Sequence, residues 1–308
     1  MMRNLDDDFD AILITGPTAS GKSALALQWA RENNGVVINA DSMQVYDTLQ
    51  VLTARPSGDE MEGVPHHLYG HVPPATLYST GEWLREIAAL IETLRGEKRL
   101  PVIVGGTGLY FKALTGGLSD MPAIPAEIRE KYRACLVEDG PAELYEELTQ
   151  RDPETAASLR PTDGQRIVRA LEVMEATGQS IRMFQQARGP MIIDPDRARK
   201  FVVLPDRALL HERINQRFGL MMQSGAVEEV KALLAQELSP DATAMKAIGV
   251  SQIAEMLAGR MTQAEVIEKS AAATRQYAKR QMTWFRNQMG EDWERFDPSQ
   301  SGGVPLGK

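Results

Sequence analysis

An α/β fold, in which helices flank a parallel sheet, is predicted by two features of this sequence. Short apolar runs alternate with helical runs from the start of the chain to about Leu118, as in parallel strands joined by crossover helices. Strand signals then disappear between Pro122 and about Arg199. With 308 residues, of which 43% are apolar, the chain is long enough for one large core and a helical insertion.

The first part of the core is expected to contain three strands and two helices. The expected strands are Ala11–Thr15, Gly35–Asn39 and Leu100–Val104, and the expected helices are Ser23–Arg31 and Gly81–Leu94. Ligands of parallel sheets bind beyond the carboxyl ends of the strands. The segments that follow these strands are therefore where we expect the functional site.

The central block is predicted to be entirely helical. Helices begin near Glu127, Pro141 and Gln165, and the third has apolar residues at helical spacing and Gly178 as its stop. The run Lys200–Leu204 regains strand character, so we expect the last block to rejoin the sheet and to be helical afterwards. The predicted domains are a first core part of residues 1–120, an insertion of residues 121–199, and a second core part of residues 200–308. The tail of residues 297–308, rich in Gly, Ser and Pro, is expected to be disordered.

The segment Gly16–Ser23, with the sequence GPTASGKS, joins the first expected strand to the first expected helix. It matches the GxxxxGK[ST] phosphate loop in the context that such a loop requires. Its glycines let backbone N–H groups surround phosphate oxygens, Lys22 reaches the outer phosphates, and Ser23 offers a hydroxyl to Mg²⁺. The alternative is a glycine turn that merely joins strand to helix. We therefore predict a P-loop NTPase-like sheet with a polyphosphate site made by Gly16, Thr18, Ala19, Ser20, Gly21, Lys22 and Ser23.

Composition excludes several classes of protein. No apolar run approaches the length of a membrane span, and the first residues are acidic rather than a charged-then-apolar leader. We therefore expect a cytoplasmic protein with no membrane partner. The single cysteine, Cys135, excludes an intrachain disulfide framework. The net charge of −8 argues against a general nucleic-acid binder, so any RNA site must be a local basic patch.

Two further motifs follow expected strands. Asp41 comes after the second strand, where its carboxylate is able to hold Mg²⁺ or to accept a proton from a substrate; capping of a following helix is the equal alternative. The glycine turn Gly105–Gly108 follows the third strand and carries Thr107, whose hydroxyl would lie at the mouth of the same site. A glycine turn of this kind is weak evidence by itself.

Two sets of basic residues are candidates for anion contacts. Arg213 and Arg217 are four residues apart on an expected helix, so both project from its polar face and are able to close over pyrophosphate. The alternative is a solvated face paired with Glu212 or Asp206. Near the C-terminus no acidic residue occurs between Ser270 and Arg286, which favours a track for a phosphate backbone over an ordinary solvated face. The basic residues of this track are Arg275, Lys279, Arg280 and Arg286.

Seven motifs together make the chain similar to the tRNA dimethylallyltransferase family. Their order is the family's order, and the resemblance extends from Ile12 to about Arg286. The motifs are GPTASGKS, DSMQVY, HHL, GGTGLYFKAL, RIVRALEV, LLHERINQRF and ATRQYAKRQMTWFR. Eukaryotic members carry a C-terminal zinc finger, whereas this chain has no cysteine there. The resemblance is therefore to the bacterial type.

The resemblance implies transfer of a dimethylallyl group from dimethylallyl pyrophosphate to the exocyclic amine of the adenosine 3′ of the tRNA anticodon. Thr18, Lys22 and Ser23 match the family's pyrophosphate residues, with Mg²⁺ as cofactor. Asp41 matches the general base, and Thr107 matches a residue that holds the acceptor. The matching segment that lines the flipped adenosine is Ser42, Met43 and Gln44.

The resemblance also implies contacts with the anticodon stem-loop, and we expect the enzyme to act as a monomer. The matching positions, all in the insertion, are Arg129, Gln165, Arg166 and Arg169. Lys246 and the track residues Arg275, Lys279 and Arg280 are further expected tRNA contacts. Two departures fall in this region: Arg160 replaces the family's usual histidine, and Val250–Ser251 replaces the usual tyrosine and basic residue. Three other functions stay open, namely a small-molecule kinase that uses ATP, an adenylate prenyltransferase, and a non-catalytic RNA-binding module.

Overall fold

The computed structural model of the chain describes residues 9–119, 121–186 and 189–298. The chain divides into two compact units. The larger unit is formed by residues 1–115 and 192–308, and the smaller by residues 116–191.

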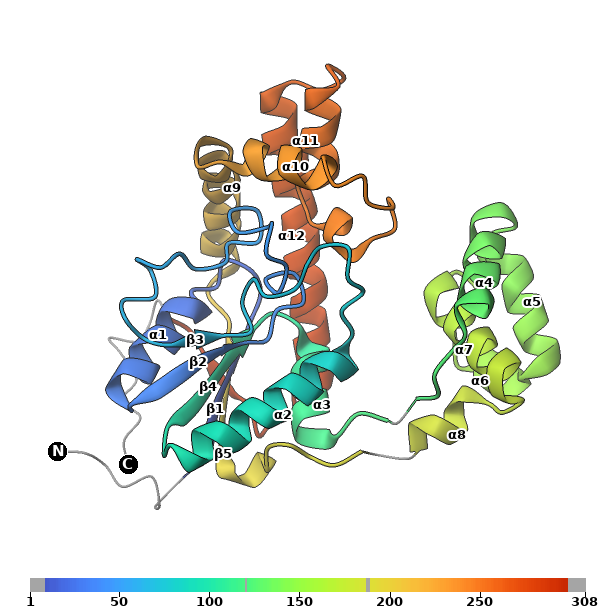
Figure 1. The fold of residues 1–308 in the computed structure, drawn as a ribbon, viewed down its shortest axis with the longest axis horizontal. Coiled ribbons are helices and arrows are strands. Elements are labelled where there is room, and N and C mark those ends of the chain that lie inside the picture. The colour runs from blue at the N-terminus through green and yellow to red at the C-terminus, as the bar shows by residue number, and fades with distance from the viewer. Residues whose placement is uncertain (1–8, 120, 187–188, 299–308) are drawn as a thin grey trace. The chain divides into compact units, whose positions relative to one another are not determined.

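The larger unit is built on one six-stranded, fully parallel sheet with the order β3-β2-β4-β1-β5-β6 (Figure 1). In this sheet β1 is central and pairs with β4 on one side and β5 on the other. The strands are β1 Ala11–Thr15, β2 Gly35–Asn39, β3 His66–His67, β4 Leu100–Gly105, β5 Ala198–Val203 and β6 Glu294–Phe296. The predicted α/β fold with a P-loop NTPase-like sheet is confirmed.

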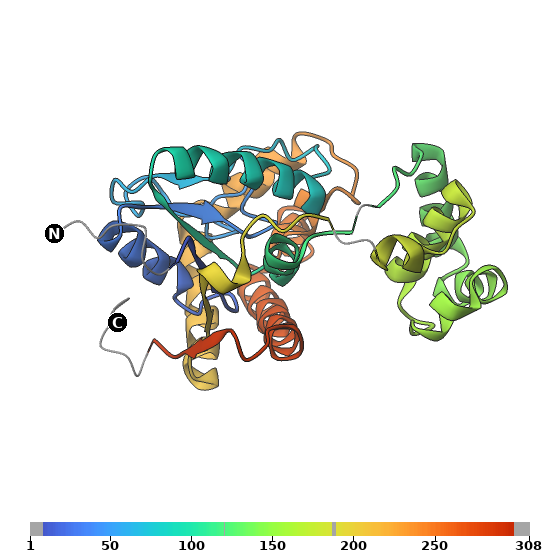
Figure 2. The same cartoon turned by 90° about the horizontal axis from the view of Figure 1, so that it is seen from below.

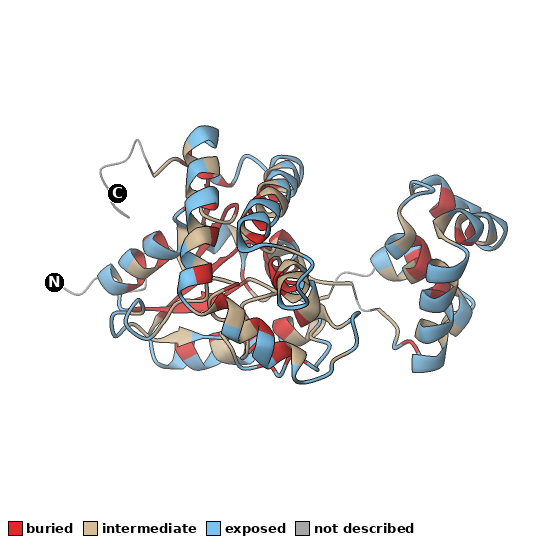
Figure 3. Cartoon of the chain, turned by 90° about the horizontal axis from the view of Figure 1, so that it is seen from above, coloured by how far each residue is buried: buried red, intermediate tan, exposed pale blue. Residues whose placement is uncertain are grey.

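Apolar side chains on both faces of the strands explain why helices cover the sheet on two sides (Figure 2). Ile12 and Ile14 pack against α1, Lys22–Glu32. Leu13 belongs to the opposite core, which three helices share. Those helices are α2 Thr80–Gly96, α3 Gly108–Gly116 and α12 Gln263–Gln288. The central strands are buried throughout (Figure 3), as expected for a parallel sheet covered on both faces.

A second group of elements packs around the loop that follows β2. Val45, Tyr46 and Leu49 of this loop share a core with the second half of the chain. The elements there are α9 Arg207–Gln223, α10 Ala226–Leu234, η2 Thr243–Lys246 and α11 Val250–Leu257, and the short η1 Pro195–Arg197 precedes β5. This packing fixes the loop after β2, which also carries Asp41.

The smaller unit is all helical, with a core that includes Tyr132, Leu148, Ile167 and Leu171. Gly178 ends the longest of its helices in the left-handed conformation, with φ 69°, which favours glycine at a helix C-terminus. The helices are α4 Ala126–Glu138, α5 Pro141–Arg151, α6 Pro153–Ala157, α7 Gly164–Thr177 and α8 Ile181–Gln186.

The structure corrects the predicted boundaries of the insertion and the secondary structure of the last block. The predicted insertion of residues 121–199 differs from the smaller unit of residues 116–191, because Ile192 and Ile193 donate backbone hydrogen bonds to Leu114 of the larger unit. The short strands β3 and β6 were not predicted. Within the predicted disordered tail, residues 299–308 lie outside the described residues. No helix in the described part of the chain is long and apolar enough to cross a membrane.

Candidate functional site

The phosphate loop has the strained backbone that its sequence predicts. Gly21 has φ 92° and Ala19 has φ 63°, so the chain turns sharply before α1 begins at Lys22. Gly16 is required by close packing, because a Cβ there would lie 2.6 Å from the carbonyl oxygen of Val203 in β5. The loop therefore places the positive N-terminus of α1 at the carboxyl end of the sheet.

This loop forms one wall of a polar hollow of about 380 Å³. Asp41 and Gln44 enter it from the loop after β2, and Arg213 and Arg217 enter it from α9. The remaining lining residues are Thr18, Ala19, Ser20, Gly21, Lys22, Ser23, Ala24, Thr53 and Ala54. Cations, backbone donors and one carboxylate thus meet where a parallel sheet binds its ligands.

Lys22 is held in a poorly solvated position in this hollow. Burial lowers the pKa of its ammonium group to about 8, the charge of Asp41 opposes this shift, and the charge of Arg217 adds to it. Its Nζ donates a hydrogen bond to the carbonyl oxygen of Pro17 at 3.2 Å. A bound anion would add its negative charge to that of Asp41 and so favour the charged ammonium group.

The two arginines of α9 face the phosphate loop rather than the acidic residues proposed as alternative partners. Asp206 caps the N-terminus of α9, and Glu212 accepts a hydrogen bond from Gln216. Among the described residues, neither arginine forms an ion pair with Asp206 or Glu212, and both line the hollow. Burial lowers the pKa of Arg217, while the charges of Glu60 and Asp41 raise it.

Asp41 does not cap a helix, because the segment after it forms turns rather than a helix. Its Oδ1 accepts a hydrogen bond from the backbone N–H of Met43 at 2.9 Å. The buried Asn39 holds the backbone of Asp41 in turn, accepting from its N–H at 2.9 Å and donating to its carbonyl at 3.0 Å. The N-cap alternative is therefore wrong, and the carboxylate faces the hollow in a fixed position.

Thr107 ties the loop after β4 to the loop after β2. Its Oγ1 accepts a hydrogen bond from the N–H of Ser42 at 3.0 Å and donates to the Ser42 hydroxyl at 3.3 Å. Its own N–H donates to the carbonyl of Ala40 at 3.2 Å. Thr107, Ser42 and Met43 adjoin the Asp41 side of the site but do not line the polar hollow itself.

The charge of Asp41 acts on three tyrosines, of which Tyr110 is buried and Tyr69 and Tyr277 are partly buried. Burial raises the pKa of Tyr69, Tyr110 and Tyr277, and the Asp41 carboxylate raises each further. The Asp41 carboxylate therefore lies near enough to these three phenol groups to disfavour their ionisation.

Two polar side chains of the site, the buried Gln281 and the partly buried Glu229, were not predicted, because they lie inside ordinary helices. Gln281 of α12 accepts a hydrogen bond from the N–H of Thr18 and donates one to the carbonyl of Gly106, both at 3.0 Å. Glu229 of α10 accepts from the N–H groups of Gln50, Val51 and Leu52 at 2.9, 2.6 and 3.1 Å. Only polarity within an otherwise buried helix face would have indicated them.

Glu229 supports the part of the hollow's wall that contains Thr53 and Ala54. The loop that it holds continues to Thr53 and Ala54, whose carbonyls accept hydrogen bonds from Nε2 of Gln44 at 2.9 and 3.0 Å. With both amide hydrogens used in this way, Gln44 has only its Oε1 left to offer a ligand. Gln44 therefore presents a hydrogen-bond acceptor.

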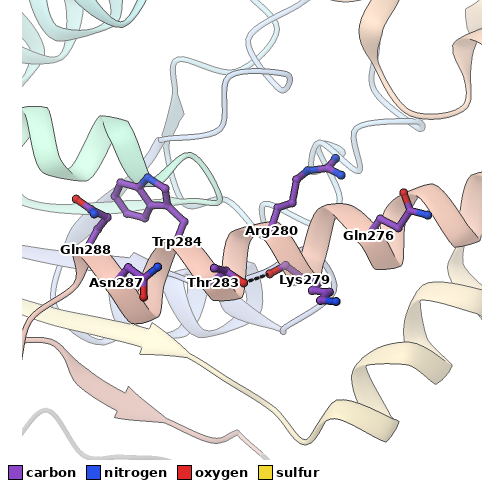
Figure 4. Close-up of a pocket in the computed structure, with 7 residues that line it drawn as sticks. All are labelled: Gln276, Lys279, Arg280, Thr283, Trp284, Asn287 and Gln288. Atoms are coloured by element: carbon purple, nitrogen blue, oxygen red, sulfur yellow. Dashed lines mark hydrogen bonds between the residues drawn. The ribbon is translucent and has the colours of Figure 1, made fainter. Parts of the chain in front are cut away.

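Lys279 and Arg280 of α12 border a larger hollow of about 510 Å³, and its described lining residues all belong to α12 (Figure 4). Lys279 and Arg280 point to different sides of the helix, and the Arg280 guanidinium lies 5.6 Å from the ring centre of Tyr277. Arg275 donates a hydrogen bond to Asn215 of α9. Lys246 lies elsewhere, with its Nζ 3.6 Å from Asp241. The cations of α12 are thus presented along a helix that also reaches the phosphate loop through Gln281.

The smaller unit holds the other predicted RNA contacts. Gln165 and Arg166 are exposed at the start of α7, where Arg166 lies 3.5 Å from Asp163. Arg169 lies one turn further along and pairs with the buried Glu172 at 3.2 Å. Arg129 is partly buried on α4. Three of the four therefore share one end of α7.

A metal ion would find hard oxygen ligands in the polar hollow. The Ser23 hydroxyl and the Asp41 carboxylate both line it, and oxygen ligands suit Mg²⁺. Among the residues that the structure describes, no group of three or more His, Cys, Asp or Glu is able to hold a metal. A cation there would therefore take further ligands from a bound phosphate group.

Family comparisons agree along almost the whole chain. Residues 44–288 match the family model described as IPP transferase, and residues 9–69 match that described as isopentenyl transferase. The chain is 76% identical over 298 residues to a tRNA dimethylallyltransferase of Agrobacterium fabrum, covering 97% of this chain and 100% of the relative. A tRNA dimethylallyltransferase of Allorhizobium ampelinum is 70% identical, with 97% and 98% coverage.

Solved structures show the same relationship. A full-length tRNA isopentenylpyrophosphate transferase from Bacillus halodurans aligns with a TM-score of 0.67 and 32% identity, covering 94% of this chain and 89% of that one. A eukaryotic dimethylallyltransferase acting on tRNA aligns with a TM-score of 0.79 and 28% identity, covering 93% and 73%.

Proposed function

The chain belongs to the IPP transferase family, and from this premise we propose that it transfers a dimethylallyl group to the exocyclic amine of the adenosine 3′ of the tRNA anticodon. The proposed donor is dimethylallyl pyrophosphate, and pyrophosphate is released. The observation that carries the proposal is the meeting of the phosphate loop, two arginines and the Asp41 carboxylate in one polar hollow.

In this proposal the donor's pyrophosphate binds to the phosphate loop. Backbone N–H groups at the start of α1 and the side chains of Lys22, Arg213 and Arg217 neutralise the charge that develops on the leaving group. Thr18, Lys22 and Ser23 are the donor contacts that the family resemblance implies. The low pKa of Lys22 supports this role, because burial disfavours its ammonium charge in the free enzyme and the negative charge of the donor would offset that cost.

We propose Mg²⁺ as the cofactor, held by the Ser23 hydroxyl and by oxygens of the pyrophosphate. When bound, the ion would withdraw charge from the leaving group and make pyrophosphate easier to expel. The residues of the hollow provide the oxygen ligands this ion requires.

The acceptor amine attacks the allylic carbon from the Asp41 side. A new bond forms between the adenine nitrogen and that carbon, and the carbon–oxygen bond to pyrophosphate breaks. The amine becomes positively charged as it attacks, so Asp41 accepts its proton. Ser42, Met43, Gln44 and Thr107 surround the flipped base, and the acceptor oxygen of Gln44 suits a donor on that base.

The tRNA is bound by two basic surfaces, each belonging to one unit. One is the α12 track of Arg275, Lys279 and Arg280 in the larger unit, and the other is the α7 end with Gln165, Arg166 and Arg169 in the smaller unit. Arg129 of the smaller unit and Lys246 of the larger unit are further proposed contacts. We propose that a monomer is sufficient, because one chain supplies every residue of the hollow. The tRNA substrate would place the reaction in the cytoplasm.

The test is to incubate the protein with Mg²⁺, dimethylallyl pyrophosphate and one acceptor at a time, and to detect prenylated nucleoside by mass. We expect efficient transfer to an anticodon stem-loop with adenosine 3′ of the anticodon, and very poor transfer to AMP, because a single nucleotide cannot reach the basic surfaces. Efficient transfer to AMP would indicate an adenylate prenyltransferase. Phosphorylation of a small metabolite by ATP would indicate a kinase, and stem-loop binding without transfer an RNA-binding module.

A further inference from the structure

The amide of Gln281 forms hydrogen bonds to two different loops, the phosphate loop after β1 and the loop after β4. Gln281 lies inside α12 and its residue is only 6% exposed. Its Oε1 accepts from the N–H of Thr18 in the phosphate loop, and its Nε2 donates to the carbonyl of Gly106 beside Thr107. One side chain thus contacts the loop assigned to the donor and the loop assigned to the acceptor.

The Gln281 amide connects β1 and β4 beyond the point where their strand pairing ends. The last pair between β1 and β4 is Thr15 with Gly105, where the Thr15 hydroxyl also donates to the Gly105 carbonyl at 3.0 Å. Beyond this pair, the segments that follow β1 and β4 leave the sheet as separate loops. The Gln281 amide joins them again by offering one donor and one acceptor, as a peptide group would.

The backbone leaves space for this amide at one position. A Cβ at Gly106 would lie 2.4 Å from Nε2 of Gln281 and 3.4 Å from Oδ2 of Asp41. Gly106 therefore allows close approach of the amide and the carboxylate to the same short segment. Because the amide is buried, loss of its two bonds would not be replaced by bulk water.

We propose that Gln281 is a positioning residue, which sets the distance between the donor's pyrophosphate and the acceptor base. This rests on the proposed function. Reacting atoms must be held within a narrow range of distance and angle, and a displacement of about 1 Å is able to cost on the order of a hundredfold in rate. Gln281 touches neither reacting group; it acts through Thr18 and Gly106.

The test compares Gln281→Met, which keeps the length of the side chain but neither hydrogen bond, with Gln263→Met at the exposed start of the same helix. Calorimetry measures the binding of inorganic pyrophosphate and, separately, of the anticodon stem-loop in the absence of donor. Turnover is measured per active site. For Gln281→Met we expect both separate affinities within about threefold of wild type and kcat lower by about 10- to 100-fold. Gln263→Met should match wild type in all three.

A double-mutant cycle with Gly106→Ala tests the contact without relying on the reaction. The added methyl should displace the amide and lower thermal stability, and Gln281→Ala should relieve this clash, so the double variant should be no less stable than Gln281→Ala alone. If Gln281→Met does not fold, Gly106→Ala is used for the kinetic test instead, because it displaces the amide without removing it.

Three outcomes would each overturn the proposal: an unchanged kcat, a loss of pyrophosphate binding that accounts for the whole loss of rate, or strict additivity in the cycle. Failure of the wild-type protein to prenylate any acceptor would instead overturn the proposed function.

Discussion

The hydroxyl of Thr107 accepts a hydrogen bond from the backbone N–H of Ser42 at 3.0 Å. This contact fixes the loop after β4 against the loop after β2, next to the carboxylate of Asp41. Thr107→Val keeps the shape of the side chain and leaves the Ser42 N–H without its partner. We expect kcat to fall by roughly one to two orders of magnitude, because the acceptor loop loses its fixed position.

Thr107→Ser is the matched control, since it keeps the hydroxyl and removes only a methyl group. Its kcat should stay within about threefold of wild type. Equal losses in both variants would show that the methyl group, rather than the hydrogen bond, is what the site needs.

Asp41→Asn separates chemistry from binding. The amide keeps the shape of the carboxylate and its acceptor oxygen for the Met43 N–H, but it does not accept a proton. Transfer should fall by about two to four orders of magnitude while the affinity for the stem-loop is unchanged. Single-turnover assays and filter binding measure the two quantities. If affinity and rate fall together, Asp41 has a structural role and the base lies elsewhere.

The parts of this architecture that the sequence predicts are those that depend on local motifs. The strand ends, the phosphate loop and Asp41 are visible because each depends on neighbouring residues, and the structure gathers Lys22, Asp41 and Arg217 into one hollow. The strands β3 and β6 are too short for a periodic signal, with two and three residues. The insertion boundary was misplaced because Ile192 bonds to Leu114, a partner far away in the sequence.

The supporting residues of the site escape prediction for the same reason. Gln281 lies 263 residues from Thr18, and Glu229 lies 178 residues from Val51. The one local signal for either side chain is its polarity on an otherwise buried helix face, and that signal names no partner. Their roles follow only from long-range packing, which a single sequence does not display.

Glu229 provides a test of that long-range support. Glu229→Gln removes one of the two oxygens that accept from three backbone N–H groups, so the loop before Thr53 should loosen. We expect a loss of about 1–3 kcal/mol in the free energy of unfolding and a higher KM for the stem-loop, because this loop orients Gln44.

Glu228→Gln is its control, since Glu228 is exposed and lies 3.8 Å from Lys231. Denaturant unfolding and steady-state kinetics should leave this variant near wild type. A KM for the stem-loop that is unchanged in Glu229→Gln would contradict a link between Glu229 and the acceptor.

The basic track of α12 predicts a specific salt dependence. Replacing both Arg275 and Lys279 by glutamine should weaken stem-loop binding and lower the slope of log affinity against log salt by between about one and two. Lys269→Gln on the same helix, outside the acid-free run, is the control and should leave the slope unchanged. Equal slopes in the double variant and wild type would show that Arg275 and Lys279 do not contact RNA phosphates and belong to an ordinary solvated face.

The low pKa of Lys22, about 8 in the free protein, predicts opposite effects of pH on binding and on stability. Below this pKa the ammonium group is charged and attracts pyrophosphate; above it the charge is lost. The ratio of pyrophosphate affinities between wild type and Lys22→Ala should therefore be largest below pH 8 and fall toward one above it. Taking this ratio cancels the effect of the ionisation of pyrophosphate itself.

The effect of pH on stability has the opposite sign, because the folded protein disfavours a charge that the unfolded chain keeps up to the ordinary pKa of 10.5. Without ligand, Lys22→Ala should be more stable than wild type at pH 7, and the difference should shrink as pH rises from 8 to 10.5. Turnover by this variant should fall by roughly two or more orders of magnitude, since it lacks the charge that stabilises the leaving group. Calorimetric titration across pH, with thermal unfolding of both proteins, measures each part; a pH-independent affinity ratio would remove the Lys22 ammonium from donor binding.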